Sequence, residues 1–321
     1  MAWTIRVLLC ASAGFFSPLA FSLALPQPRV AAQADAGVTD SERGRGEEAL
    51  KKALARLKAP EPAERVSAAD ELGKRGQRFR HAISDALRPM LASDPEPVVR
   101  AAAGRALGRL VAREAVPELI AALGDRAAEV RVVAAAALWR LPDPAAVPAL
   151  LTCASDADPV VREWSALALG VAADPRAAPV LVRLLSDPQR AVQLAAVRSL
   201  GRVRRAEALA PLVKYLKDAK RDEEEKDEAV NAIVSLDGGE RQFALLELLA
   251  APGIDARQRV RLSLALGKVG DAAAIEALRS LSRDKAASVR EAAKHALADL
   301  QKRSKAAPPA VGVLPADAAR P

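Results

Sequence analysis

Apolar residues recur along most of this chain at spacings of three and four, which is the pattern of amphipathic helices. They come in paired segments: one of about eleven residues, such as EAVPELIAALG, and then a longer one, such as DPEPVVRAAAGRALGRL from Asp94. Counted from the first residue of each Val-Arg slot, offsets 0, 4, 7, 8 and 11 are Val, Ala, Ala, Leu and an apolar residue. These offsets share one side of a helix, so each unit is predicted to be helix, short turn, helix.

The unit repeats at a nearly fixed period. The leucines that mark it are Leu72, Leu107, Leu138, Leu169, Leu200, Leu236, Leu266 and Leu297. Their successive gaps are 35, 31, 31, 31, 36, 30 and 31 residues. A period near 31 predicts an all-α solenoid of about eight stacked units, in which each unit buries its apolar stripe against its neighbours.

Three residue types mark the ends of the predicted helices. An aspartate precedes the second helix and is expected to cap its N-terminus: Asp94, Asp125, Asp156, Asp187 and Asp218. A proline marks the first turn of the first helix, where no N–H partner is lost: Pro117, Pro148, Pro179 and Pro211. A glycine near the end of the second helix predicts either close helix contact or a C-terminal stop: Gly108, Gly170, Gly201 and Gly267.

The motif D-P-x-V-R-x-x-A-A-x-A-L-G resembles the short HEAT-like repeat of the phycobilisome-lyase type, over roughly residues 46–302. The resemblance implies an Asp–Arg ladder between neighbouring turns, formed by Arg100, Arg131, Arg162 and Arg290, which Gln193 interrupts. The pattern departs from the motif at Glu64-Arg65, Glu228-Ala229 and Gln258-Arg259. Because such families include adaptors, lyase subunits and DNA-repair relatives, the resemblance specifies the fold far better than the function.

The N-terminus differs in kind from the repeats. Arg6 is followed by an uncharged apolar run over 7–25, so residues 1–25 are expected to be a secretory signal peptide cleaved after Ala24 or Ala34. An uncleaved membrane anchor and lipidation at Cys10 are the alternatives. Residues 26–45 and 303–321 lack periodicity and are expected to be a disordered tether and tail. The expected location is the bacterial periplasm or the exterior, or the membrane if residues 7–25 remain as an anchor.

The sequence contains few residues that could form a catalytic or metal-binding site. Only His81 and His295 are present, without metal-site spacing, and no nucleophile or phosphate-loop motif appears. Cys153 alone would remain after export, and it is expected to be a buried apolar filler. We therefore expect neither a cofactor nor a metal, and no enzymatic activity. A lyase-like or enzyme-associated subunit remains an alternative.

The formal net charge is +8, or +7 without Arg6, which makes polyanion binding another alternative. The basic residues are interspersed with acidic ones, so nucleic acid is not the expected partner. The charged run over 217–228 lengthens one period and is expected to lie in the turn between two helices, protruding from the solenoid edge. We interpret it as a solvated helix start rather than a partner or cation contact.

The second helices offer the most informative surface. In HEAT-like arrays they line a concave groove, so by resemblance offsets 2, 6 and 10 face that groove. Aliphatic residues and arginines are frequent at these offsets, and two of the three tryptophans lie beside them. The candidate binding residues are Arg105, Arg109, Trp139, Arg140, Glu163, Trp164, Leu167, Arg198 and Arg202. Tryptophan and arginine are enriched at interface hot spots, although both indoles packing between helices is an equal alternative.

The sequence as a whole predicts an exported, monomeric solenoid that acts as a non-enzymatic scaffold. Its expected partner is a protein or peptide segment held in the groove, with tryptophans burying apolar area and arginines selecting acidic groups.

Overall fold

A computed structural model describes residues 40–75, 77–218 and 220–306. Within these ranges every regular element is an α-helix or a short 3-10 helix, and no helix there is long and apolar enough to cross a membrane. The chain divides into two compact units between Ala49 and Leu50. Of the first unit, only the start of helix α2 (Asp40–Arg56) is described. The expected signal peptide or anchor, residues 1–25, lies outside the described residues.

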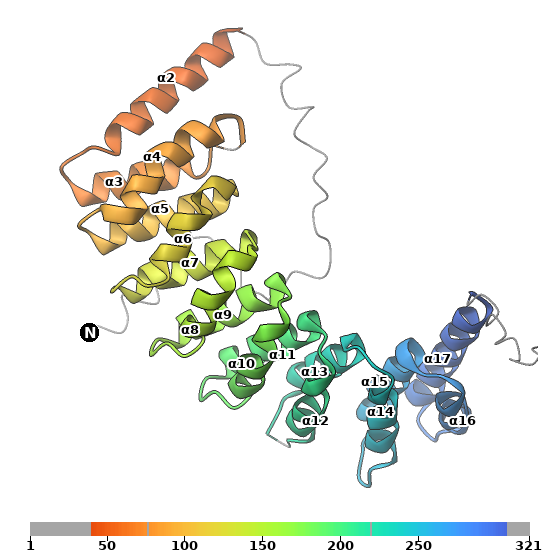
Figure 1. The fold of residues 1–321 in the computed structure, drawn as a ribbon. Helices are drawn as coiled ribbons and strands as arrows, with labels where there is room; N and C mark the ends of the chain where they lie inside the picture. The colour runs from red at the N-terminus through yellow and green to blue at the C-terminus, as the bar shows by residue number, and fades with distance from the viewer. Residues whose placement is uncertain (1–39, 76, 219, 307–321) are drawn as a thin grey trace, which may run out of the picture. The chain divides into compact units, whose positions relative to one another are not determined.

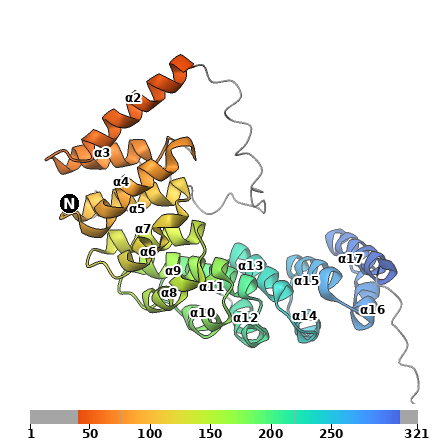
Figure 2. The same ribbon diagram turned by 45° about the horizontal axis from the view of Figure 1, so that its top comes forward.

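The described residues of the second unit form successive helix pairs (Figures 1 and 2). The first helices after α2 are α4 (Arg80–Ser93), α6 (Val116–Ala122), α8 (Val147–Cys153), α10 (Ala178–Leu184), α12 (Leu209–Lys217), α14 (Glu240–Ala250) and α16 (Ala272–Leu281). The second helices are α3 (Pro62–Leu72), α5 (Pro97–Leu110), α7 (Ala128–Arg140), α9 (Pro159–Ala172), α11 (Arg190–Val203), α13 (Glu223–Ser235), α15 (Ala256–Val269) and α17 (Ala287–Ala306). Each second helix packs on the next one along the chain, which confirms the all-α solenoid.

The ends of the repeat array differ in detail from the predicted boundaries. Helix α2 begins at Asp40, inside the stretch 26–45 that was expected to be a tether. Helix α17 continues to Ala306, past the predicted start of the tail at Arg303. The Arg303 guanidinium donates hydrogen bonds to the carbonyls of Gly267, Lys268 and Gly270, at the C-terminal end of α15. The first residue assigned to the tail therefore fastens the last two second helices together. The remainder of both segments, residues 26–39 and 307–321, lies outside the described residues.

The repeated aspartates bind the backbone N–H of the N-cap residue of the second helix that follows, rather than capping the helix themselves. Asp125 Oδ1 accepts a hydrogen bond from the backbone N–H of Ala127 at 2.8 Å, and Ala127 is itself the N-cap of α7. Asp94, Asp156 and Asp187 make the same bond to the residue two positions later. Each aspartate thus closes an Asx turn that leads into the helix, and the prediction that it caps the helix directly was wrong.

The second oxygen of each aspartate completes the ladder that the family resemblance implied. Arg131 Nε lies 2.7 Å from Asp156 Oδ2, and its Nη2 donates to the other carboxylate oxygen at 2.8 Å. A third donor, Arg131 Nη1, reaches the carbonyl of Asp125 in its own repeat at 2.9 Å. Arg100 and Arg162 repeat this arrangement with Asp125 and Asp187. Each arginine therefore joins the turn of its own unit to the turn of the next.

Gln193 occupies the position that an arginine holds elsewhere in the ladder. Arg221 of the following unit supplies the cation there instead. The Gln193 amide donates to the carbonyl of Asp187, as the arginine would. Arg221 then donates to the Gln193 side-chain oxygen and pairs with Asp218 at 3.2 Å. Its guanidinium also lies over the Tyr215 ring at 4.1 Å. The ladder therefore continues through this junction, but its arginine belongs to the following unit instead of to helix α11.

Glycine sets how closely the second helices approach one another. A Cβ on Gly108 would lie 2.8 Å from the Ala137 Cβ, and one on Gly267 would lie 2.8 Å from the Ala296 Cα. Gly73, Gly170 and Gly201 meet the same obstruction from Ala106, Ser199 and Ala232. The close-contact interpretation is therefore confirmed. The alternative of a C-terminal stop was wrong, because α5, α9 and α11 continue for two residues past the glycine and are followed by the left-handed residues Val111, Ala173 and Arg204.

Three second helices that precede another, α3, α7 and α13, contain no glycine, but Gly73 directly follows α3 and makes the close contact there. In α7 the position is held by Trp139, and α13 ends at Ser235, before it reaches the equivalent position. The glycine contact found at the other junctions is therefore missing at α7–α9 and α13–α15.

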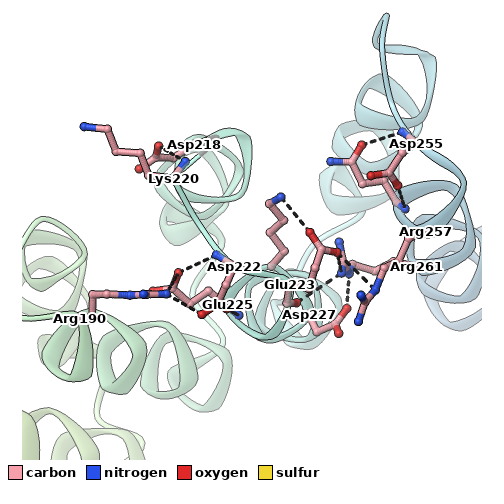
Figure 3. Close-up of polar contacts among 12 residues, drawn as sticks. Arg190, Asp218, Lys220, Asp222, Glu223, Glu225, Asp227, Asp255, Arg257 and Arg261 are labelled. Atoms are coloured by element: carbon pink, nitrogen blue, oxygen red, sulfur yellow. Dashed lines mark hydrogen bonds and ion pairs between the residues drawn. The ribbon is translucent and has the colours of Figure 1, made fainter.

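The acidic start of α13 bridges its two neighbours (Figure 3). Asp222 and Glu225 form a capping box, and both accept hydrogen bonds from Arg190 of α11. On the other side, Glu223 lies 2.8 Å from Arg261 of α15, which also pairs with Asp227. Residues 218 and 220–222 of the charged run lie between α12 and α13, as predicted, whereas residues 223–228 form the first turns of α13. Carboxylates at the start of α13 engage both flanking helices.

We predict that replacing Arg131 by Leu lowers the free energy of unfolding by about 3 kcal/mol, because it leaves the Asp156 carboxylate without its bidentate partner. Urea unfolding followed by circular dichroism measures the change. Arg176→Leu is the matched control, since its pair with Asp174 is exposed and local, and it should cost less than about 1 kcal/mol. Equal costs for the two variants would contradict a structural role for the ladder.

We expect Gly108→Ala to destabilise the array by about 1–3 kcal/mol, because the added methyl group forces α5 away from α7. Gly124→Ala serves as the control, since its Cβ would meet only the Ala121 carbonyl, at 3.5 Å. Chemical denaturation midpoints of the two variants provide the comparison. Similar midpoints would mean that the close contact is not tight in solution.

A pH dependence follows from Glu223. Hydrogen bonds from Arg261 and then Lys226 lower the pKa of Glu223 from 4.5 to about 2. A carboxyl with a lowered folded-state pKa stabilises the fold above its unfolded pKa and loses that effect as pH falls toward the folded one. The stability difference between wild type and Glu223→Gln should therefore be largest above pH 4.5 and shrink toward pH 2. A difference that does not vary with pH would contradict the ion-pair assignment.

Candidate functional site

The two central tryptophans meet across the glycine-free junction between α7 and α9. The centroids of Trp139 and Trp164 lie 5.8 Å apart with an interplanar angle of 68°, an edge-to-face arrangement. Both rings are half-buried and pack against the apolar core. The Trp139 Nε1 is buried and has no hydrogen-bond partner among the described residues. The pair therefore fills the space between the helices and also presents an edge to the surface.

Residues on the next two second helices extend this surface. Glu163 is half-buried beside Trp164, and burial raises the pKa of its carboxyl, against the opposing effect of Arg198. Desolvation by the surrounding protein atoms, followed by repulsion from Arg198, lowers the pKa of Arg202, although its side chain remains exposed to solvent. Leu167 is only 8% exposed and belongs to the core. Its predicted groove position was therefore wrong, because the neighbouring second helices cover offset 6 at this point.

The predicted arginines divide into two groups. Arg105 donates to both oxygens of Asp70 at 3.1 Å, and Arg109 also reaches Asp70 at 3.2 Å. Arg198 pairs with Glu228 at 2.9 Å. Arg140 and Arg202, in contrast, are exposed and make no hydrogen bond or ion pair within the described residues. The structure brings Trp139 and Trp164 into contact and places Arg198 within electrostatic reach of Glu163 and Arg202. Arg140 follows Trp139 at the end of α7. We call these six residues the tryptophan patch. Arg105 and Arg109 instead join α5 to α3 through Asp70.

A cleft of about 400 Å³ lies at the second glycine-free junction, between α13 and α15. Its apolar wall is formed by Val230 and Val234 on one side and by Val260 and Leu264 on the other. Leu264 is 43% exposed, which is high for a large apolar side chain. The sequence analysis placed these residues on the outward offsets but did not select them. The signal that could have located the cleft is the missing glycine in α13, together with the 36-residue gap before Leu236.

Other candidates for chemistry are isolated in the described part of the chain. No group of three or more His, Cys, Asp and Glu side chains there could hold a metal ion. Cys153 is buried with its thiol toward the Leu123 carbonyl, and burial raises the pKa of that thiol. It therefore occupies the apolar position that was predicted for it. His81 is exposed and lies 3.3 Å from Glu114.

Comparison with known proteins identifies the repeat. The family model described as HEAT repeats matches residues 47–126, 84–170, 116–190, 147–234 and 183–265. A second model, the PBS lyase HEAT-like repeat, matches residues 258–284. A search of curated proteins gave no match.

Three solved structures illustrate the resemblance in fold. An engineered protein is 22% identical, with a TM-score of 0.50 and 84% of each chain covered. The CpcE–CpcF complex of phycocyanin lyase from Nostoc is also 22% identical, with a TM-score of 0.45, and covers 87% of this chain and 100% of that one. Human deoxyhypusine hydroxylase is 22% identical, with a TM-score of 0.35 over 70% of this chain and 98% of that one. The structural similarity extends to the fold alone, and the family models covering most of the repeat array show that this chain belongs to the HEAT-repeat family.

Proposed function

We propose that this protein is a non-enzymatic scaffold that binds a protein or peptide segment on the face formed by its second helices. The observation that carries the proposal is the tryptophan patch. It combines two half-buried indoles with two exposed arginines, Arg140 and Arg202, that make no ion pair within the described residues. Aromatic anchors flanked by free guanidinium groups are the usual composition of an interface hot spot.

The patch contains polar groups whose hydrogen-bonding or charge requirements a bound partner would satisfy. The buried Trp139 Nε1 has no acceptor in the described residues, and a partner carbonyl would provide one. The half-buried Glu163 carboxyl has a raised pKa, and a partner cation beside it would favour its charged form. Arg140 and Arg202 would in turn select acidic groups on the same segment.

Polyanion binding receives less support from the disposition of charge. Arginines of the ladder, such as Arg100 and Arg131, are fixed on aspartates, and those at α13 are fixed on glutamates. A polyanion would have to displace these pairs or bind only to the few arginines that remain free. A metal-dependent enzymatic role receives no support, because no group of three or more His, Cys, Asp and Glu side chains in the described residues could hold a metal ion.

We further propose that the scaffold acts in the bacterial envelope or outside the cell. Arg6 and the apolar run over 7–25 support export. N-terminal sequencing of the mature protein tests this part. Recovery of Met1 or Ala2 on soluble cytoplasmic protein would overturn it.

Peptides selected from a random library on the wild-type protein test the binding face. We predict that Arg140→Glu and Arg202→Glu each weaken the selected peptides at least tenfold, which is about 1.4 kcal/mol, without lowering the melting temperature. Trp164→Ala should weaken binding further but also destabilise the fold, because its ring packs on the core. Calorimetric titration measures the affinities.

Phe243→Ser is the matched control, because Phe243 is 60% exposed on the first helix α14, away from the second-helix face. It should leave binding unchanged. Selected peptides that bind Arg140→Glu and Arg202→Glu as tightly as wild type would remove the patch as the site. A steep loss of affinity with salt for heparin, in the absence of any selected peptide, would favour the polyanion alternative.

A further inference from the structure

The cleft between α13 and α15 has the same structural origin as the tryptophan patch but a different filling. Both lie where a second helix lacks the glycine that allows close approach. Between α7 and α9 the space is occupied by two indole rings. Between α13 and α15 it is left as a space of about 400 Å³ whose wall is formed by Val230, Val234, Val260 and Leu264. An open aliphatic surface of this kind can bury the side chains of a bound segment.

The cations that line the cleft are spaced along α15. Arg257 lies in the first turn of the helix and Lys268 in the last turn, eleven residues further on. At 1.5 Å per residue, their backbones are about 16 Å apart. The Arg257 side chain is mostly exposed and forms an ion pair with Glu223 at 3.5 Å, and the exposed Lys268 side chain makes no hydrogen bond or ion pair within the described residues. Two exposed cations therefore stand at the two ends of an aliphatic strip.

The cation between them is fixed in place (Figure 3). Arg261 pairs with Glu223 and Asp227, and its side chain is only 8% exposed. The carboxylate that lines the cleft, Asp227, is thus already neutralised by Arg261. Lys268 and the exposed Arg257, whose pair with Glu223 a ligand carboxylate can replace, are left to interact with an incoming ligand.

We propose that this cleft binds a short peptide segment in which aliphatic side chains lie between two carboxylates. The first and fifth Cα atoms of an extended five-residue segment are about 14 Å apart, so acidic side chains at its two ends can reach Arg257 and Lys268, whose backbones are about 16 Å apart. The first, third and fifth side chains share one face, so the central aliphatic side chain contacts Val234 and Leu264 while the terminal acidic side chains reach the two cations. The proposal rests on the proposed function as a peptide-binding scaffold, but it uses no residue of the tryptophan patch.

Charge and composition argue against other occupants. A second copy of the chain docking through the same face would place Arg257 and Lys268 against like charges under two-fold symmetry. Single-stranded nucleic acid is bound by aromatic platforms, whereas the residues that line this cleft include no aromatic side chain.

The test uses a fluorescein-labelled peptide with capped ends and the sequence Asp-Leu-Val-Leu-Asp, titrated with the full-length protein and followed by anisotropy. Two control peptides, Asp-Ser-Thr-Ser-Asp and Lys-Leu-Val-Leu-Lys, remove the aliphatic side chains and reverse the charge in turn. We expect each control to bind at least tenfold more weakly than the probe peptide. Leu264→Asp and Lys268→Glu should each weaken the probe peptide at least tenfold while the melting temperature stays near that of wild type. Arg140→Glu, in the tryptophan patch, should have no effect.

Each of the following outcomes would overturn the proposal. Equal binding of the three peptides, or normal binding of the probe peptide to Leu264→Asp and Lys268→Glu, excludes the cleft as its site. Loss of binding in Arg140→Glu but not in Lys268→Glu would place the peptide on the tryptophan patch, so that the scaffold function stands and this inference fails. A wild-type dimer in light scattering that Leu264→Asp converts to monomer would assign the cleft to a second copy.

Discussion

The structure depends on the contact between successive second helices. No unit can bury its apolar stripe alone, so the array exists only where each second helix lies against the next. Glycine opposite a small residue makes that contact close: Gly108 faces Ala137, and Gly170 faces Ser199. A side chain in place of either glycine would overlap the neighbouring helix. The distance between helices, and hence the surface that the array presents, is therefore set one junction at a time.

The same constraint explains where the binding surfaces lie. A junction without glycine leaves space that must be filled or remain open. At α7 it is filled by Trp139 and Trp164, and at α13 it remains as the cleft under Leu264. The opening at α13 would weaken the array if apolar contact alone held it. Arg261, paired with Glu223 and Asp227, replaces part of that lost contact with charge-assisted hydrogen bonds.

The sequence specified the repeat but not the contacts that its departures create. The leucine period predicted the solenoid, and the repeated Asp and Arg positions predicted the ladder through the family resemblance. What the spacing could not show is which carboxylate each arginine would choose. Asp70, far away in the sequence, engages Arg105 and Arg109 and removes both from the predicted site. Leu167 was misassigned for a related reason, since a helical wheel describes one helix and not the neighbours that cover it.

The net positive charge is a poor guide to the partner of this protein, because the arginines of the ladder are already paired with aspartates. A positive total would ordinarily indicate a polyanion partner. Here many of the guanidinium groups that contribute to it lie within hydrogen-bonding distance of a carboxylate or a carbonyl, as Arg100 and Arg162 do. A partner interacts with the more exposed cations, such as Arg140, Arg202, Arg257 and Lys268, and all of these except Arg202 lie on helices of the two glycine-free junctions. The positions that depart from the repeat therefore supply both the apolar surface and the uncommitted charge, and a HEAT-repeat array acquires its binding specificity where its repeat is interrupted.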